Sequence, residues 1–292
     1  MSTTSAIDPH PRSRVKILET EMSYVDVGQG HPVVFLHGNP TSSFIWRNII
    51  PYVVPHGRCL APDLIGMGQS GESGARSYRF VDHARYLDAW FEALSLTSDV
   101  TIVGHDWGGA LGFHRAARYP SQVRAIAYME TFVQPRQWQD LRPAGAEFFR
   151  RLRSDEGEHL ILNENAFVER VLPRATLRTL TAEEMAVYRA PYLDRERRWP
   201  TLVWPREQPI DGVPADVVAI VDGYGRWLAG SEHPKLFIDA LPGALIGDRA
   251  RNFCRPWPNQ RVVTVKGIHF VQEDSPAEIG EALREFVRML WA

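Results

Sequence analysis

The sequence contains little cysteine, little net charge and no long hydrophobic run, and each shortage excludes a class of protein. Its two cysteines, Cys59 and Cys254, lie far apart without CxxC spacing, which predicts buried free thiols rather than a disulfide framework or a zinc site. A formal net charge of -2 offers no basic surface for the phosphates of nucleic acid. No stretch approaches the roughly 18 apolar residues of a membrane span, and residues 1–14 lack the apolar core of a secretory signal. These absences favour a cytoplasmic protein that binds neither nucleic acid nor a membrane.

Motifs that hold metals or organic cofactors are also missing. The chain has no HExxH, no GxxxxGK and no cluster of cysteine and histidine, and the GQG at residues 28–30 is a lone GxG. We therefore predict no metal and no organic cofactor. What is present, 292 residues of which 44% are hydrophobic, fits one large soluble domain with an insertion, as a monomer or a homo-oligomer.

Strand and helix patterns alternate along most of the chain. Residues 15–27 alternate apolar and polar side chains, which predicts an edge strand before a tight turn. Residues 32–36 form a continuous apolar, β-branched run, which predicts a strand buried on both faces, and residues 123–129 predict another buried strand. Further strands are predicted at residues 59–61, 100–103, 235–238 and 261–265. Helical spacing follows several of them, at residues 80–96, after residue 107 as far as Pro120, and at 276–290. This order predicts an α/β fold with a mostly parallel sheet, helices on both faces and reactive groups at the carboxyl ends of the strands.

The rhythm changes in the middle of the chain. From about residue 131 to 211 the patterns are helical, no convincing strand occurs, and Trp, Phe, Arg and Pro are frequent. We interpret this segment as a helical cap inserted into the sheet domain. The predicted division is a core of residues 1–130 and 212–292 with a cap of residues 131–211.

The strongest chemical signal is the GHDWG sequence at residues 104–108. It lies between a predicted buried strand and a helix, where a nucleophile elbow holds a strained, exposed side chain between glycines. The usual elbow carries serine, whereas this one carries Asp106. A carboxylate is ionised at neutral pH and can displace a leaving group from saturated carbon to give an alkyl ester.

Hydrolysis of such an ester requires a base, and His269 follows the last predicted strand. The order nucleophile, acid, histidine along the chain is that of α/β-hydrolases. The histidine needs a carboxylate to fix its tautomer, and two acids stand at strand ends before it, Glu130 and Asp239. The sequence pattern alone leaves both open.

A leaving group that departs as an anion needs hydrogen-bond donors in a dry pocket. Two side chains can supply them, the indole of Trp107 beside the nucleophile and the amide of Asn39 after the first buried strand. The backbone N–H groups of the same two residues could hold the oxyanion while water attacks the ester.

These segments resemble the haloalkane dehalogenase family, and the likeness extends from about residue 15 to 290. HGNPT at 37–41, GHDWG at 104–108, YME at 128–130 and GIHF at 267–270 look like the family's halide, nucleophile, acid and base segments. The resemblance implies an eight-stranded α/β-hydrolase fold with a cap and favours Glu130 as the acid. Asp239 stays in reserve, because a sister subfamily places its acid near that position.

The same resemblance implies a cap that closes over an apolar pocket for a small halogenated substrate, with water and halide as the other partners. Candidate pocket residues are Phe148, Phe149, Phe167, Leu172, Pro205 and Leu245, although the three phenylalanines and Leu172 could equally form the internal core of the cap. An apolar wall suits a substrate with almost no hydrogen-bonding capacity.

Other functions share this scaffold. An epoxide hydrolase would use the same Asp nucleophile with paired cap tyrosines, and Tyr188 and Tyr192 lie one helical turn apart. Fluoroacetate dehalogenases resemble the chain less, because arginine follows their nucleophile where this chain has Trp107. A luciferase-like oxygenase carries the same motifs. A non-catalytic binding protein of this fold would have no reason to keep the nucleophile, base, acid and both donors together.

Overall fold

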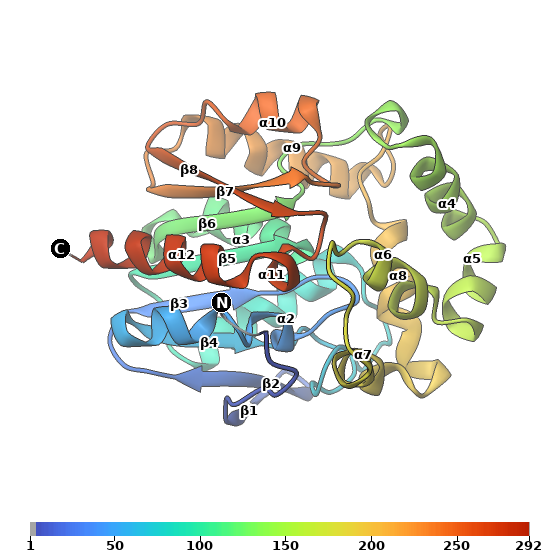
Figure 1. The fold of residues 1–292 in the computed structure, drawn as a ribbon, viewed down its shortest axis with the longest axis horizontal. Helices are drawn as coiled ribbons and strands as arrows, with labels where there is room; N and C mark the ends of the chain where they lie inside the picture. Colours follow the sequence, from blue (N-terminus) through green and yellow to red (C-terminus); the bar gives the residue numbers. More distant parts are fainter. Residues whose placement is uncertain (1–3, 292) are drawn as a thin grey trace.

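Eight strands form one sheet in the order β1-β2-β4-β3-β5-β6-β7-β8 in this computed structural model, which describes residues 4–291 (Figure 1). Neighbouring strands from β4 through β3 to β8 are parallel, whereas β2 pairs antiparallel with both β1 and β4. The strands are β1 (Arg12–Ile17), β2 (Thr20–Val27), β3 (Pro32–Leu36), β4 (Arg58–Pro62), β5 (Val100–Asp106), β6 (Val123–Thr131), β7 (Lys235–Pro242) and β8 (Gln260–Gly267). The mostly parallel sheet is therefore confirmed.

The prediction of one strand over residues 15–27 was wrong. The segment folds as a hairpin, in which Val15 pairs with Met22 and Ile17 with Thr20. The turn between β1 and β2 lies at Leu18 and Glu19, and Leu18 adopts a positive φ of 46° and is 54% exposed. The alternation of apolar and polar residues breaks at residues 17–21, but the turn contains no glycine or proline to mark it.

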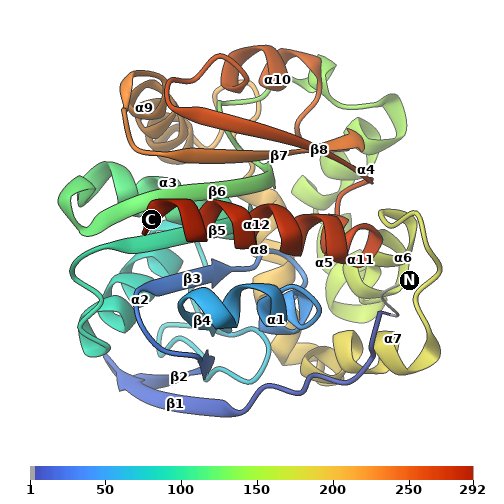
Figure 2. The same cartoon turned by 60° about the vertical axis from the view of Figure 1, so that its left-hand side comes forward.

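Helices cover both faces of the sheet. Figure 2 shows α12 and α1 across one face, and α3 packs on the other face against β5, β6 and α9. In α12 the buried residues Ile279, Leu283, Phe286 and Val287 recur at helical spacing, which gives the helix one apolar face toward the sheet. The helices are α1 (Ile50–Val53), α2 (Phe80–Ala93), α3 (Trp107–Arg118), α4 (Pro143–Arg153), α5 (Glu156–Glu158), α6 (Leu172–Arg174), α7 (Ala182–Arg189), α8 (Trp199–Arg206), α9 (Ala215–Gly230), α10 (Asp248–Cys254), α11 (Val271–Asp274) and α12 (Pro276–Leu290). Within residues 4–291, no helix combines the length and hydrophobicity needed to cross a bilayer.

The segment between β6 and α9 is helical and contains α4 to α8. It lies beyond the carboxyl ends of the parallel strands, and we call residues 131–211 the cap (Figure 1). The cap has a small apolar cluster of its own, separate from the main core, built from α4, α8 and the segments around residues 160–171. The two cysteines predicted to be free thiols are both buried and unbonded to each other.

A buried ionic cluster ties the cap to the core. Arg47 donates to Glu273 Oε1 at 2.6 Å and Oε2 at 3.0 Å, and to Glu184 of α7 at 2.9 Å. Arg178, on the cap segment before α7, donates to both of these glutamates, and the hydroxyl of Tyr188 donates to Glu273. All of these charges have partners, so the cluster fixes α7 against α11 without leaving an isolated buried charge.

Candidate active site

Asp106 occupies a sharp turn between β5 and α3. Its backbone has φ 50° and ψ -128°, a strained conformation for a residue other than glycine. The turn can close because Gly104 has no Cβ. A Cβ at this position would lie only 2.4 Å from the Cα of Gly109. On the other side, a Cβ at Gly38 would lie 2.3 Å from Asp106 Oδ2. Glycine is therefore required where neighbouring backbone approaches the elbow.

The carboxylate of Asp106 is 5% exposed and faces both a backbone donor and an imidazole. Oδ2 accepts from the backbone N–H of Asn39 at 2.8 Å, and Oδ1 lies 3.7 Å from His269 Nε2. Burial raises the pKa of Asp106 above its ordinary value, while the charge of His269 and the backbone N–H groups of Asn39 and Trp107 act in the opposite direction. Two backbone donors thus stand ready for negative charge on this side chain.

Glu130 ends β6 and also has a positive φ, 40°. Its Oε2 accepts from the backbone N–H groups of Ala244 at 2.9 Å and Leu245 at 2.7 Å, and Oε1 accepts from Ile246 at 3.3 Å. His269 Nδ1 lies 3.3 Å from Oε2. A loop after β7 therefore holds the carboxylate in the direction that fixes the imidazole.

The ring of His269 lies between the two carboxylates, with Nδ1 toward Glu130 and Nε2 toward Asp106. Burial lowers the pKa of His269, but the hydrogen bond to Glu130 and the charges of Asp106 and Glu130 outweigh it, so the pKa is raised. An N–H on Nδ1 that donates to Glu130 leaves Nε2 free to accept a proton on the side of Asp106.

The backbone of His269 is also fixed by contacts that the sequence did not predict. His105 Nε2 lies 2.8 Å from the carbonyl oxygen of His269, and the His269 N–H donates to the carbonyl of Ala175 in the cap at 3.0 Å. Burial lowers the pKa of His105 strongly, so this imidazole is neutral and its Nε2–H is the donor. The only sequence signal for His105 was its place beside Asp106 in the GHDWG motif.

Asn39 and Trp107 are both buried beside the carboxylate. Within residues 4–291, neither Asn39 Nδ2 nor Trp107 Nε1 donates to a protein acceptor, although their backbone N–H groups both act on Asp106. The indole ring is fixed by Phe132 at 4.3 Å and by a stack on Trp204 at 4.6 Å between ring centroids. The rigidly held indole N–H of Trp107 and the side-chain amide of Asn39 are therefore available to an incoming anion.

The reserve acid is engaged elsewhere. Asp239 of β7 is buried and accepts from Arg251 at 2.8 Å and Arg255 at 3.4 Å. Among the described residues, the carboxylate within hydrogen-bond distance of the His269 ring is Glu130, not Asp239.

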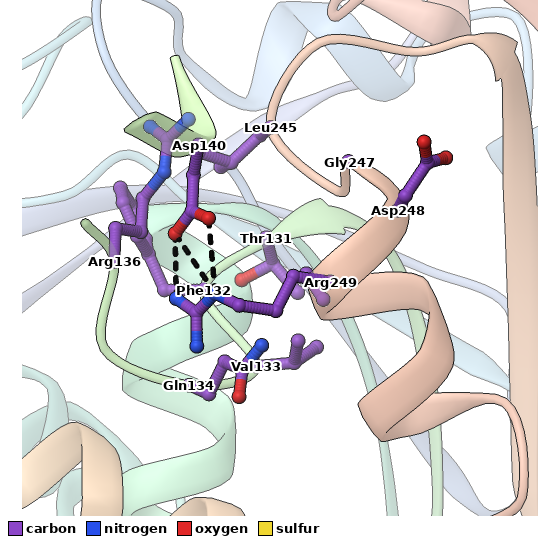
Figure 3. Close-up of a pocket in the computed structure, with 11 residues that line it drawn as sticks. Thr131, Phe132, Val133, Gln134, Arg136, Asp140, Leu245, Gly247, Asp248 and Arg249 are labelled. Atoms are coloured by element: carbon purple, nitrogen blue, oxygen red, sulfur yellow. Dashed lines mark hydrogen bonds and ion pairs between the residues drawn. The ribbon is translucent and has the colours of Figure 1, made fainter. Parts of the chain in front are cut away.

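The six candidate pocket residues fall into three places. Phe148 and Phe149 of α4 pack with Phe167 in the apolar cluster of the cap. Leu172 and Pro205 are buried in α6 and α8, and Leu172 belongs to the main core. Leu245 lines a cavity together with Thr131 and Phe132, as Figure 3 shows. The other cap candidates, the tyrosines, are not a free pair: the Tyr188 hydroxyl donates to Glu273, while the Tyr192 hydroxyl is enclosed without a partner among residues 4–291.

The strand order and the nucleophile elbow at Asp106 are those of an α/β-hydrolase, and comparison with known proteins agrees. The family model described as alpha/beta hydrolase fold matches residues 31–211. A haloalkane dehalogenase of Sphingobium indicum is 52% identical over 94% of this chain and 95% of its own length. One from Mycolicibacterium smegmatis is 49% identical over 93% of this chain and 89% of its own length. The crystal structure of a haloalkane dehalogenase from Bradyrhizobium elkani superposes with a TM-score of 0.93, at 46% identity, over 96% of this chain and 98% of that one.

The chain belongs to the haloalkane dehalogenase family of the α/β-hydrolases. The resemblance inferred from its motifs and the predicted α/β-hydrolase fold are therefore confirmed.

Proposed function

We propose that the protein hydrolyses the carbon–halogen bond of haloalkanes to a primary alcohol, a halide ion and a proton, through an alkyl ester on Asp106. One observation carries the proposal. A buried carboxylate on a strained turn has the imidazole of His269 at 3.7 Å and, at the next residue, the indole of Trp107, which is held by its stack on Trp204. These are a nucleophile, a base for water and a donor for a departing anion.

In the first step an oxygen of Asp106 forms a bond to the carbon that carries the halogen. The carbon–halogen bond breaks, and its electron pair leaves with the halide. Asn39 Nδ2–H and Trp107 Nε1–H donate to this halide as its charge develops, which stabilises the transition state more than the neutral substrate. No proton moves in this step, and the product is a neutral alkyl ester.

In the second step water attacks the ester carbonyl of Asp106 while His269 Nε2 takes its proton. The backbone N–H groups of Asn39 and Trp107, which already point at this side chain, hold the oxyanion. Collapse breaks the bond to the alkoxide oxygen, which takes the proton from His269 and leaves as the alcohol. The carboxylic acid of Asp106 then ionises, so one water is consumed and one proton is released. Glu130 stabilises the imidazolium that forms in between.

The ester itself prepares the base for the second step. The charge of Asp106 is one of the causes that raise the pKa of His269 in the free protein. Esterification removes that charge, so the pKa of His269 falls and the neutral base becomes more populated. The protein thus holds a proton-accepting nitrogen available when water must be activated.

The substrate we expect is a small, apolar haloalkane, and no metal or organic cofactor takes part in these steps. Epoxide opening would need acids on the ring oxygen, and the hydroxyl of Tyr188 already donates to Glu273. No contact in the structure favours that reaction over dehalogenation.

The test is an assay of three substrates, 1-bromobutane, 1,2-dibromoethane and styrene oxide, with bromide, acid and diol measured separately. We expect equal release of bromide and acid from both bromides, no diol from styrene oxide, and no turnover by Asp106→Ala. Asp239→Asn is the matched control, a buried carboxylate that should be dispensable for bromide release. Diol from styrene oxide as the main product, or binding of the bromides without turnover by the wild type, would contradict the proposal.

A further inference from the structure

Two cavities lie side by side at the junction of the cap and the core. The inner one, of about 40 Å³, is drawn in Figure 3, and the outer one has a volume of about 360 Å³. Gln134, Arg136 and Arg249 line both, so the cavities share one wall. From the inner to the outer cavity, the lining changes from Thr131 and Phe132 to exposed polar residues.

The inner cavity adjoins the proposed catalytic groups. Its lining residue Thr131 donates from Oγ1 to the backbone carbonyl of Asp106 at 2.6 Å. Its lining residue Phe132 lies 4.3 Å from the indole of Trp107 between ring centroids. A single layer of side chains therefore separates the donors beside Asp106 from this cavity.

The shared wall contains an arginine without a counter-ion. Among the described residues, Arg136 forms no ion pair with a carboxylate, and its one side-chain hydrogen bond, from Nη1 to Gln208 Oε1, is 3.3 Å long. Arg153 shares this feature: it donates to the backbone carbonyl of Gln208, and its Nε is enclosed without a partner in residues 4–291. Gln134 Nε2 is likewise an enclosed donor without a partner in that part of the chain.

The other arginines of the two cavities differ from Arg136. Asp140 binds Arg249 through both carboxylate oxygens, as the dashed lines in Figure 3 show. Asp222 pairs with Arg226 at 2.9 Å, and Arg226 is 74% exposed. These two arginines each have a carboxylate in direct contact, whereas Arg136 has none among the described residues and is the arginine of the wall that no carboxylate contacts.

Arg136 is held in place and remains charged. Its N–H donates to the carbonyl of Pro209 at 2.8 Å, and its carbonyl accepts from the N–H of Asp211 at 3.0 Å, which pins the backbone between two cap segments. Burial lowers the pKa of Arg136 to about 10, still well above neutral pH, so the guanidinium is cationic. Among the neighbouring charges, that of Asp140 raises this pKa most, those of Glu130 and Asp106 raise it less, and that of Arg249 lowers it.

We propose that Arg136, with the amide of Gln134, forms a binding subsite for a small monovalent anion between the Asn39–Trp107 donors and the outer cavity. Such an anion would gain the donors that now lack acceptors. Two sources share this chemistry: the halide that the reaction frees, and the carboxylate of a haloalkanoic acid substrate. Both sources rest on the proposed function, whereas the binding of an anion can be measured without it.

The direct test uses bromide itself. Crystals of the wild type and of Arg136→Met, Arg136→Lys and Arg226→Gln are soaked in stepped bromide concentrations, and the ion is located by anomalous scattering. We expect bromide at the Arg136 guanidinium in the wild type and in Arg226→Gln, weaker in Arg136→Lys and absent in Arg136→Met. The site at Asn39 and Trp107 should stay filled in all four, which also shows that each variant is folded.

Kinetics then identify the source of the anion. If halide is the ligand, product inhibition by bromide should weaken on the order of tenfold in Arg136→Met. If a carboxylate is the ligand, kcat/KM for 6-bromohexanoate relative to 1-bromohexane should fall on the order of tenfold instead. Bromide bound at Asn39 and Trp107 but never at Arg136, or bound equally in Arg136→Met, overturns the subsite. Absence of bromide release by the wild type would refute the proposed function and leave the crystallographic result on Arg136 standing.

Discussion

Replacement of Glu130 by glutamine should separate the two chemical steps. The carboxylate accepts three backbone N–H groups and faces His269 Nδ1 at 3.3 Å. In Glu130→Gln the amide oxygen can keep the bonds from Ala244 and Leu245, but the amide nitrogen then meets the N–H of Ile246, donor against donor. We expect the free energy of unfolding to fall by about 1–3 kcal/mol, the cost of one unsatisfied buried group.

The effect on chemistry should be larger and confined to hydrolysis. Loss of a charge-assisted hydrogen bond to the imidazolium costs about 1.5–3 kcal/mol, which slows ester hydrolysis about 10- to 150-fold. If the amide nitrogen turns toward His269, the imidazole takes the wrong tautomer and the loss approaches roughly 10⁴-fold. Alkylation of Asp106 needs no base, so its rate should stay close to that of the wild type.

Rapid-quench measurement of bromide release from 1-bromobutane tests this reasoning. Glu130→Gln should give a full burst of one bromide per active site followed by slow turnover, with alkylated protein visible by intact mass. Asp239→Asn removes an equally buried carboxylate and should keep the wild-type ratio of the two rates. Equal slowing of both steps in Glu130→Gln, or the burst pattern in Asp239→Asn, would refute the assignment of the acid.

Four further outcomes follow from the site and the fold. Because burial raises the pKa of Asp106 and only the ionised form attacks, kcat/KM should decline on the acid side at a pH above the ordinary range of an aspartate; a pH–rate profile that stays flat down to that range would contradict this. The pKa of His269 read from hydrolysis of preformed ester should lie below that of the free protein, measured by NMR titration. Trp107→Phe should slow alkylation about 10²–10³-fold in single-turnover experiments, and less for an iodide than for a chloride substrate. Glu273→Gln leaves Arg47 with part of its charge unpaired, so urea unfolding should show a loss of about 3–5 kcal/mol.

The sequence predicted the strands whose two faces are both buried, because burial on both faces selects apolar residues along the whole strand. Strands β5 and β6 are covered on both faces, so residues 100–103 and 123–129 are apolar apart from Thr101 and Arg124. The elbow follows directly from the glycines around Asp106. The β1–β2 hairpin was missed because its turn at Leu18 uses no residue typical of turns.

The acid and the anion subsite could not be read from sequence for a different reason. Glu130 and Asp239 lie in the adjacent strands β6 and β7, and only the path of residues 243–246 decides which carboxylate meets the ring. Arg136 carries no motif at all. Its meaning comes from the absence of an ion-pair partner in the described part of the chain, a property of the packed structure rather than of the local sequence.

Incubation of His269→Ala with excess 1-bromobutane shows whether the carboxylate of Asp106 becomes alkylated. Proteolysis and mass spectrometry should find one butyl group in place of a proton on the peptide that contains Asp106, formed at the same rate as bromide appears. Bromide release with that peptide unmodified, or a butyl group on any other residue, would show that Asp106 is not the nucleophile.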